Sequence, residues 1–420
     1  MTDSTRISII ISILVMFPIV QGGSLEEADR SYFGVNHGHN FSIMVEGGLL
    51  WHRQDFTWNS IEHEKGIFDF EQYDEVVEET AEVGVRILGI LDYSAEWASS
   101  APTTWDHARD RAPPKNLEDW SNYVFKTVEH FKGRVSHWEV WNEPNTNFFW
   151  LPKKDAQGYT NLLRAAYVAA KQADPQCVVL IGGMIGFGPE DLEYIEEIYS
   201  RGGGSYFDVF AWHPYPGDPN PCLDQFNFTE FMAELKGIIS RYGDEHKEIW
   251  FTEIAWGIGP NTTREDQANY LVRSYVLSFA EGVDRFFWFN FRGPPQEEGS
   301  ALLDYDFTPR PAFNAHANLA ELLSGAIYDR EIELKDAHCH SFSKNDERIV
   351  FAWVPWDSKD VVLRLKSGVD HIHLSESYGD SLVPEGTGNR LRLTLTESPV
   401  IITGLDEADI RSMESSGSNI

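Results

Sequence analysis

The chain has 420 residues, of which 42% are hydrophobic and 13% aromatic. This is enough apolar material for one large domain and a smaller one, and it excludes a disordered chain. The formal net charge is −32, from 66 acidic and 34 basic residues, and no run of Lys or Arg interrupts it. Such a surface repels phosphate backbones and anionic lipids, so neither nucleic acid nor an anionic membrane is an expected partner.

The first 22 residues have the pattern of a signal peptide. Arg6 precedes an apolar stretch, 7–20, that is too short to span a bilayer but has the length of a signal core. Cleavage would fall at Val20-Gln21-Gly22. We therefore expect a soluble protein, secreted or periplasmic, that begins near Gly23. An uncleaved membrane anchor is the alternative.

From about Tyr32 onward, short β-forming runs alternate with amphipathic helical patterns. Apolar residues at i, i+3, i+4 and i+7 indicate the helices, for example at Tyr159, Leu162, Leu163 and Ala166. Eight strands, each followed by a helix, predict an α/β fold with a (β/α)₈ TIM barrel at 23–325. A doubly wound open sheet is the rival, but it does not need eight units. The expected strands are 32–36, 49–53, 85–92, 135–142, 178–183, 209–213, 248–253 and 286–289.

Beyond the last expected barrel helix, 311–323, the apolar pattern changes to a period of two. Residues 390–396, RLRLTLT, alternate strictly, and 349–353 and 361–365 are further strand candidates. This pattern predicts a small C-terminal antiparallel β-domain at 326–404, similar to a sandwich and packed on the barrel. Residues 405–420 are polar and are expected to form a tail.

In a TIM barrel, catalytic groups lie at the carboxyl ends of different strands. The residues expected there are richer in acids, amides and aromatic rings than a packed core would supply. They are Asn36, His37, Arg53, Asp92, Tyr93, Asn142, Glu143, His213, Tyr215, Glu253 and Trp288.

Two glutamates among them indicate the chemistry. Glu143 belongs to WEVWNEPN at 138–145, and Glu253 belongs to FTEIAWG at 251–257. A buried carboxylate is costly unless something uses it. Cleavage of a glycosidic bond needs one carboxylic acid to protonate the leaving oxygen and one carboxylate to attack or to activate water. The other interpretation of the pair is a buried ion pair or a calcium site.

The surroundings of the two glutamates are expected to differ. Glu143 has aromatic neighbours and faces a second negative charge, so its pKa should be raised and it suits the acid. Glu253 should be held ionised by Arg53, with Tyr215 donating a hydrogen bond, and it suits the nucleophile. For Arg53, a structural salt bridge under the pocket is an equal alternative to direct catalytic support.

The other candidates are expected to bind or to support. Asn142 is placed to bind a substrate hydroxyl beside the bond that breaks. His213 is expected to hydrogen-bond a catalytic group rather than to act as the base. Trp288 is expected to form a platform for a sugar ring, with barrel packing as the alternative. Four rings are left open between rim contacts and packing: Trp97, Phe148, Trp150 and Trp256.

No metal or cofactor is expected. Three short segments each place two histidines on one side of a strand: His37 and His39, His338 and His340, and His371 and His373. A zinc site would require the last two pairs to face each other, and such pairs are more often plain strand residues. The glycines at 182–188 lack the G-x-G-x-x-G order, so no dinucleotide site is expected.

Together these motifs resemble glycoside hydrolase clan A. The resemblance rests on WNEPN at 141–145, an Arg ending the second strand, HPY at 213–215, TE at 252–253 and a Trp on the eighth strand. The longer form WEVWNEPN, with a terminal β-domain, looks most like family 39, which includes β-xylosidases; family 5 endoglycanases are next. The likeness implies a retaining mechanism with Glu143 as acid/base and Glu253 as nucleophile. It also implies a sugar subsite shaped by Asn142, Arg53, Tyr215 and Trp288.

The expected function is therefore that of a secreted β-glycoside hydrolase, which cleaves a β-linked oligo- or polysaccharide through a covalent glycosyl-enzyme intermediate. An endo-acting glycanase of the family 5 type, a transglycosylase and a catalytically silent carbohydrate-binding barrel are the alternatives. The chain is shorter than the family 39 xylosidases and has a reduced β-domain, which leaves the sugar open. Exo or endo action depends on whether the loops 93–118, 145–158, 216–230 and 292–308 close a pocket or leave a groove.

Overall fold

The computed structural model describes residues 25–105, 108–217, 221–294, 299–365, 369, 371–406 and 410–415. The expected signal peptide, 1–22, lies outside the described residues. Among the helices of these ranges, none combines the length and the apolar character needed to cross a bilayer.

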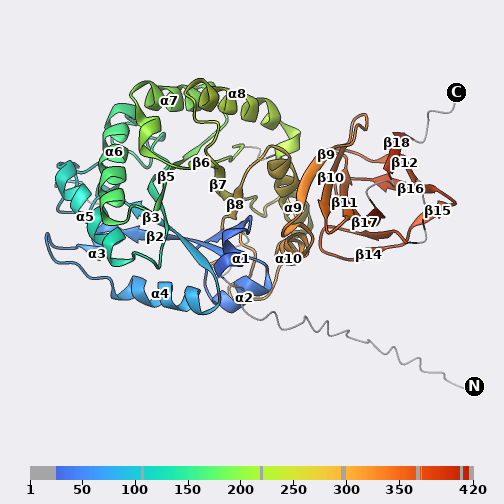
Figure 1. Cartoon of the computed structure of the whole chain (residues 1–420), viewed down its shortest axis with the longest axis horizontal. Coiled ribbons are helices and arrows are strands. Elements are labelled where there is room, and N and C mark those ends of the chain that lie inside the picture. The colour runs from blue at the N-terminus through green and yellow to red at the C-terminus, as the bar shows by residue number, and fades with distance from the viewer. Residues whose placement is uncertain are drawn as a thin grey trace, which may run out of the picture.

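Eight parallel strands close into a barrel at the centre of the larger domain (Figure 1). Each strand pairs with the next, and the eighth returns to the first, with Gly34 opposite Phe287. This closure confirms the TIM barrel and excludes the open doubly wound sheet. The strands are β1 (Phe33–Asn36), β2 (Trp51–Thr57), β3 (Arg86–Asp92), β4 (His137–Asn142), β5 (Val178–Ile185), β6 (Phe210–His213), β7 (Ile249–Ile254) and β8 (Arg285–Trp288).

Helices cover the outside of the barrel (Figure 1). They are α1 (Leu25–Asp29), α2 (Phe41–Glu46), α3 (Trp58–Ile61), α4 (Glu71–Glu82), α5 (Leu117–His130), α6 (Ala156–Ala173), α7 (Pro189–Ser200), α8 (Phe228–Arg241), α9 (Arg264–Ala280) and α10 (Pro311–Leu323), with 3₁₀ turns η1 (Arg109–Arg111), η2 (Gly203–Tyr206) and η3 (Leu223–Gln225). At the start of α6, the Asp155 side chain accepts a hydrogen bond from the N–H of Gln157. Tyr159, Leu162 and Leu163 of this helix are buried, as their spacing predicts.

Aromatic rings fill the amino end of the barrel. Trp51 begins β2, and its ring centre lies 5.3 Å from that of Trp250, the second residue of β7. The ring of His137, which begins β4, stacks on Trp250 at 5.2 Å. Because this end of the barrel is plugged by rings, polar side chains at the carboxyl end form the working face.

The second domain consists of two antiparallel sheets (Figure 1). One has the strand order β14-β13-β17-β11-β10-β9 and the other the order β15-β16-β12-β18. The strands are β9 (Ile327–Glu331), β10 (His338–Lys344), β11 (Glu347–Trp353), β12 (Lys359–Leu365), β13 (His373–Ser375), β14 (Ser381–Leu382), β15 (Glu385–Thr387), β16 (Arg390–Leu395), β17 (Val400–Asp406) and β18 (Ile410–Ser415). The predicted antiparallel β-domain is thus confirmed.

This domain extends further than the sequence predicted. β17 runs to Asp406, and β18 pairs with β12, with Leu363 opposite Met413. Part of the segment 405–420 is therefore strand and not tail. β18 lies at the edge of its sheet, where backbone pairing on one side is enough, and its sequence IRSMES shows no strong apolar pattern.

A buried carboxylate of the barrel, Asp224, contacts both domains. Arg273 of α9 donates two hydrogen bonds, of 2.6 and 3.0 Å, to Asp224 of η3, and both side chains are fully buried. Trp353 of β11 donates its indole N–H to Asp224 at 2.5 Å. The charge pair lies within the barrel domain, and the hydrogen bond from Trp353 is a contact that reaches it from the β-domain.

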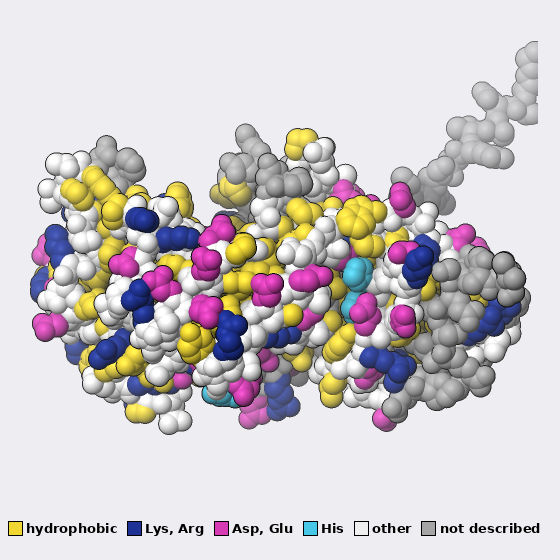
Figure 2. Space-filling view, turned by 90° about the horizontal axis from the view of Figure 1, so that it is seen from above, with side chains coloured by type: hydrophobic (Ala, Val, Ile, Leu, Met, Phe, Trp, Pro, Cys, Tyr) yellow, Lys and Arg dark blue, Asp and Glu magenta, His cyan; other side chains and the backbone are white. Residues whose placement is uncertain are grey.

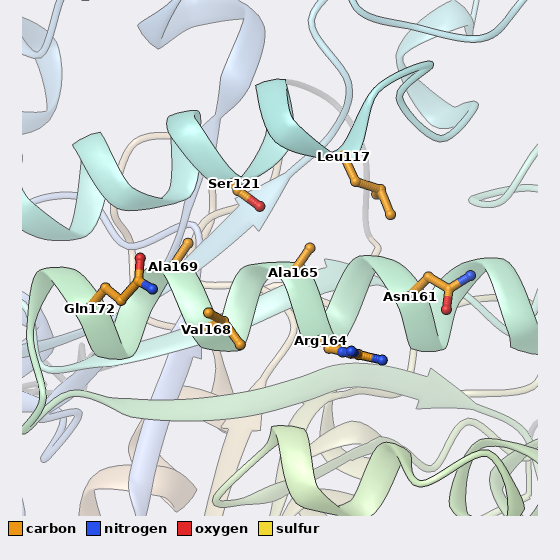
Figure 3. A pocket seen from close by; sticks show the side chains of 8 residues that line it. All are labelled: Leu117, Ser121, Asn161, Arg164, Ala165, Val168, Ala169 and Gln172. Atoms are coloured by element: carbon orange, nitrogen blue, oxygen red, sulfur yellow. The ribbon is translucent and has the colours of Figure 1, made fainter.

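A groove lies on the outside of the barrel, away from the carboxyl ends of the strands. This groove of about 460 Å³ runs between α5 and α6 and is lined by residues such as Leu117, Arg164 and Val168 (Figure 3). Val168 is exposed, which places the groove on the outer wall of the barrel.

Figure 2 shows acidic and basic side chains interspersed over one face, with no continuous basic surface on that face.

Candidate active site

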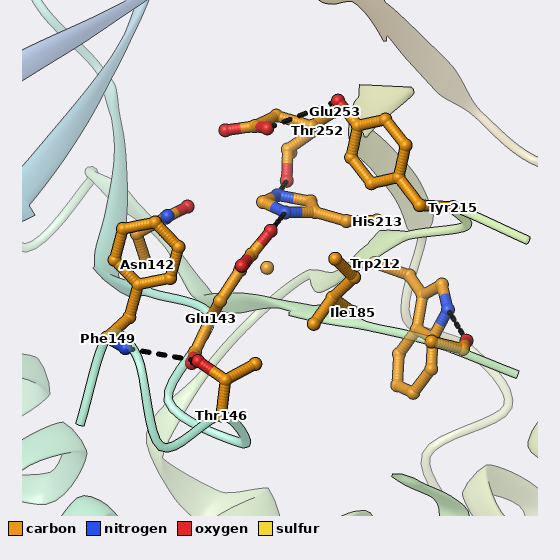
Figure 4. A network of polar contacts seen from close by, with 12 residues as sticks. Asn142, Glu143, Thr146, Phe149, Ile185, Trp212, His213, Tyr215, Thr252 and Glu253 are labelled. Carbon is orange, nitrogen blue, oxygen red and sulfur yellow. Dashed lines mark hydrogen bonds and ion pairs between the residues drawn. The ribbon is translucent and has the colours of Figure 1, made fainter. Parts of the chain in front are cut away.

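Glu143 and Glu253 meet at the carboxyl end of the barrel (Figure 4). Glu143 directly follows β4, and Glu253 is the next-to-last residue of β7. One oxygen of each carboxylate and one ring nitrogen of His213 all lie within 4.8 Å of one another. The two glutamate side chains are only 9% and 13% exposed. The structure therefore brings together the two carboxyl groups that the sequence singled out.

The backbone around Glu143 is held in an unusual conformation. Trp141 has φ 70° and Glu143 has φ 43°, a region that few residues other than glycine adopt. The N–H of Glu143 donates to the backbone oxygen of Gly183 at 2.9 Å, and the indole of Trp141 donates to that of Phe149 at 2.8 Å. Such strain costs about 1–3 kcal/mol per residue and persists where the surroundings fix a functional group.

Arg53 organises the floor of the site. Its guanidinium has five N–H donors, and the structure gives it five hydrogen bonds. Two of 2.9 Å go to Glu139, and one of 2.6 Å goes to Glu253. The others go to Asn36 at 2.9 Å and Asn142 at 3.0 Å. Arg53 thus forms the structural salt bridge below the pocket and also contacts Glu253, while its direct catalytic support stays a prediction.

Glu139 is the residue of this hydrogen-bond network that the sequence analysis missed. It lies inside β4, is fully buried, and accepts from Arg53, from the N–H of Gly183 at 2.7 Å and from the hydroxyl of Thr252 at 3.3 Å. The sequence did contain a signal for Glu139, because it is the one acidic residue in the otherwise apolar run WEVW. It was overlooked because catalytic groups were expected at the end of the strand, and Glu139 lies before that end.

The two carboxyl groups differ in their electrostatic surroundings. Burial, and next the charge of Glu253, raises the pKa of Glu143 from 4.5 to about 8. Burial also raises the pKa of Glu253, but the charge of Arg53 and its hydrogen bond oppose the rise. With its pKa raised to about 8, Glu143 keeps its proton at neutral pH, whereas the charge and hydrogen bond of Arg53 favour the ionised form of Glu253.

A chain of hydrogen bonds connects Glu143 to Glu139 through His213 and Thr252. Figure 4 shows the part from Glu143 to Thr252. Burial, and next the charge of Arg53, lowers the pKa of His213 well below its usual value, so the ring is neutral. The Thr252 hydroxyl donates to Glu139, so it accepts from Nε2–H of His213, 3.0 Å away. The lone pair is then on Nδ1, which lies 3.0 Å from Oε1 of Glu143 and accepts the proton of that acid. His213 thus supports Glu143, as the sequence predicted.

The remaining predicted residues have different surroundings. Tyr215 donates to Oε2 of Glu253 at 3.4 Å, as expected. Asn142 has its oxygen bound to Arg53, which leaves the amide N–H₂ as the side that can meet a substrate hydroxyl. Trp288 is fully buried beside Trp256 and donates to the backbone oxygen of Ser300 at 2.7 Å. The structure presents no open face of this ring, so a sugar platform at Trp288 stays a prediction.

Four aromatic residues had no assigned place from the sequence, either at the rim of the site or in the core. In the structure two of them are buried and two are at least partly exposed. Trp150 and Trp256 are buried and belong to the barrel core. Phe148 is 59% exposed, and the guanidinium of Arg111 lies 4.0 Å from its ring centre. Trp97 is partly exposed and donates to the backbone oxygen of Glu62 at 2.8 Å.

Glu143, His213 and Glu253 also have the spacing of metal ligands. Arg53, however, lies 2.6 Å from Glu253 and already supplies the positive charge that a cation would bring. His213 also has both ring nitrogens engaged, one with Glu143 and one with Thr252. The donor set therefore suits acid–base chemistry better than it suits a metal ion.

Comparisons with known proteins place the chain among glycoside hydrolases. A family model described as glycosyl hydrolase family 53 matches residues 37–280, more than half of the chain. A β-xylosidase of Geobacillus stearothermophilus is 30% identical over 288 residues, covering 60% of this chain and 56% of that protein. A β-1,4-xylanase of Dictyoglomus thermophilum is 26% identical over 165 residues, covering 36% of this chain and 45% of that protein. The chain thus spans about half the length of the curated relatives it matches.

Solved structures share the fold of both domains. A family 39 glycoside hydrolase from Bacteroides cellulosilyticus WH2 has a TM-score of 0.75 at 22% identity, covering 90% of this chain and 82% of that one. A monomeric β-xylosidase from Caulobacter crescentus CB15 has a TM-score of 0.62 at 16% identity, covering 90% and 97%. The motifs look most like family 39, whereas the matching family model is that of family 53. By that match, the chain belongs to glycosyl hydrolase family 53.

Proposed function

We propose that the chain is a retaining β-glycoside hydrolase that cleaves a β-linked oligo- or polysaccharide. One observation carries the proposal: an oxygen of Glu143 lies within 4.8 Å of an oxygen of Glu253. Retaining glycosidases hold their two carboxyl groups about 5–5.5 Å apart, whereas inverting enzymes need about 6.5–9.5 Å to admit a water molecule. The raised pKa of Glu143 supports its role as the acid, and the contact with Arg53 favours the ionised form of Glu253 that a nucleophile needs.

In the first step, an oxygen of Glu253 attacks the anomeric carbon while the glycosidic C–O bond breaks. Glu143 gives its proton to the leaving oxygen, so the alcohol departs neutral and a glycosyl ester of Glu253 remains. Arg53 holds the other Glu253 oxygen at 2.6 Å and orients the attacking one. The amide of Asn142 can donate to a sugar hydroxyl beside the reacting carbon.

In the second step, the ionised Glu143 removes a proton from a water molecule. The water oxygen attacks the anomeric carbon, the ester bond breaks, and its electron pair returns to Glu253. Two inversions at one carbon retain the configuration of the sugar. Both residues end the cycle in their starting protonation states.

The sugar class follows from the relatives rather than from the pocket. Relatives described as a β-xylosidase and a β-1,4-xylanase support a β-linked xylose substrate. The first of them supports exo action and the second endo action. Release of single sugars from the end of an oligosaccharide would support exo action, and mixed internal products would support the endo-acting glycanase.

The experiment is turnover by the purified full chain on aryl β-glycosides and β-linked polysaccharides, with the anomer of the first product read by proton NMR. We expect a β-configured first product and loss of turnover in Glu253→Gln. A first product of α configuration would overturn the retaining mechanism. Tight sugar binding without turnover across the panel would favour the silent carbohydrate-binding barrel.

The role of Glu143 is tested by substrate choice. Glu143→Gln should slow natural glycosides far more than aryl glycosides whose leaving group is activated, because an activated phenolate needs no proton. Equal losses on both substrate types would contradict the acid role of Glu143.

We also propose that the protein is exported, with cleavage near Gly23. The apolar stretch 7–20 behind Arg6 supports this proposal. Expression with the native amino terminus, followed by sequencing of the protein from the medium or periplasm, tests it. Retention of residues 1–22 in a membrane fraction would favour the uncleaved anchor.

A further inference from the structure

Two histidines and a glutamate gather on one face of the six-stranded sheet. His338 and His340 are two residues apart on β10, so both side chains lie on the same face. Glu331 of β9 is the direct pairing partner of His340. One potential ligand atom of each of the three residues lies within 4.8 Å of the others. Cys339, between the histidines, belongs to the apolar core on the opposite face.

His340 has a buried nitrogen without a partner. The residue is 3% exposed, and its Nε2 makes no hydrogen bond in the described structure. Leaving such a buried polar atom unsatisfied costs about 1–3 kcal/mol. The hydroxyl of Tyr328 lies 3.3 Å from Nδ1 of the same ring. If Tyr328 accepts Nδ1–H, the lone pair of the neutral ring is on Nε2, which is the arrangement of a histidine ready to bind a metal.

The two histidine rings pack against a tryptophan, and a second acidic residue lies near them. The rings of His338 and His340 stack on Trp353, with ring centres 5.1 and 5.5 Å away. A carboxylate oxygen of Asp224 lies 4.0 Å from Nε2 of His338. Glu331 and Asp224 are both acidic, and the nearby cation, Arg273, is bound to Asp224. The excess of negative charge favours a cation at this position.

We propose that Glu331, His338 and His340 bind a divalent transition-metal ion of the zinc type. Two imidazoles and a carboxylate are ligands that zinc prefers, at bond lengths of about 2.0–2.2 Å. A bound ion would draw the three atoms closer than their present spacing. Glu331 is exposed, so water can complete the coordination from the open side.

This site differs from the one considered from the sequence. That site needed His338 and His340 to face His371 and His373. In the sheet, β17 and β11 lie between β13, which carries His373, and β10. A glutamate from the neighbouring strand takes the place of the second histidine pair.

Zinc binding to the full chain, stripped with EDTA and desalted, tests the proposal. Calorimetric titration with ZnCl₂ should give one tight equivalent, and Co²⁺ should give a visible d–d absorption band. His338→Asn and Glu331→Gln should weaken binding by at least about 100-fold, because loss of an outer-shell partner alone costs about 10–100-fold. Tyr328→Phe keeps all three ligands and should weaken binding by about 10-fold. Near-ultraviolet circular dichroism of each variant checks that it folds.

His373→Asn on the exposed part of β13 is the matched control and should bind zinc as the natural chain does. Glu143→Gln shows whether zinc binds at this cluster or at the carboxyl groups of the barrel, because it removes a carboxylate of the barrel only. Absence of zinc binding by the natural chain would overturn the proposal. So would unchanged binding in His338→Asn, or binding that is lost in Glu143→Gln and kept in Glu331→Gln.

Discussion

Arg53 and Glu139 are joined by two hydrogen bonds of 2.9 Å, in a place where their side chains are 2% and 0% exposed. Arg53 also holds Glu253 at 2.6 Å. The position of the nucleophile therefore depends on a carboxylate that lies beneath the site, inside the barrel.

Glu139→Gln should destabilise the fold and reduce turnover together. The variant leaves the buried charge of Arg53 with one carboxylate fewer, and breaking a buried pair costs about 3–5 kcal/mol. Urea unfolding gives the free energy, and kcat gives the catalytic effect. Glu248→Gln is the control, because Glu248 is 49% exposed and pairs with Arg285 at 3.0 Å. Such surface pairs contribute about 0–1 kcal/mol, so equal losses in both variants would contradict the prediction.

The pKa of Glu143, raised to about 8, predicts an alkaline limb in the pH profile. Natural glycosides require the protonated acid, so kcat/KM should fall as pH rises through about 8. The stability of the fold should change in the same direction. Because the pKa of Glu143 is higher in the folded protein than its ordinary value of 4.5, this group stabilises the fold below pH 4.5, and the stabilisation is lost as the pH rises to about 8. Both effects should disappear in Glu143→Gln. A limb that persists in this variant would assign the titration to another group.

Thr252→Val should move this alkaline limb to lower pH. The substitution removes the oxygen that accepts Nε2–H of His213 at 3.0 Å. The ring can then carry its proton on Nδ1 and donate it to Glu143, which favours the ionised form of that acid. The pH profile of kcat/KM on a natural glycoside measures the shift. A limb at an unchanged pH would show that the tautomer of His213 has no part in setting this pKa.

Gly183→Ala should disturb the site through His213. A Cβ at this position would lie 2.1 Å from Nε2 of His213 and 2.7 Å from Oγ1 of Thr252. Since the crowded groups are buried, we expect a loss of about 1–3 kcal/mol in unfolding free energy, together with reduced kcat. Gly237→Ala in α8 is the control, because nothing lies within 4 Å of its Cβ. That substitution should stabilise the helix by about 0.5–1 kcal/mol, and a loss of kcat there would point to a general effect.

The barrel and the two central glutamates could be predicted because their signals are local. Each strand is an apolar run that ends in polar residues, and the carboxyl ends of parallel strands meet at one face. Glu143, Glu253 and Tyr215 lie at or just beyond such ends, so their convergence follows from the topology. Arg53 was expected to end its strand, but it is the third residue of β2 (Trp51–Thr57), which continues to Thr57.

Glu139 was missed because its partner lies 86 residues away in the chain, on another strand. Barrel strands are buried on both sides, so an apolar run does not reveal which side chains point to the interior. Trp288 lies at a strand end, as expected, but the sequence could not show that its indole N–H binds the backbone oxygen of Ser300. β18 was missed because an edge strand is specified by backbone pairing more than by side chains.

Asp224 accepts hydrogen bonds from Arg273 of the barrel and Trp353 of the sheets, and the Trp353 ring belongs to the barrel core. Removing the sheets would therefore leave a buried carboxylate with a missing donor and a hollow where a tryptophan had packed. Heat should melt the two domains in one cooperative transition, and proteolysis should not release a functional barrel. The β-domain therefore packs as part of the barrel core, and we expect the enzyme to need it for stability.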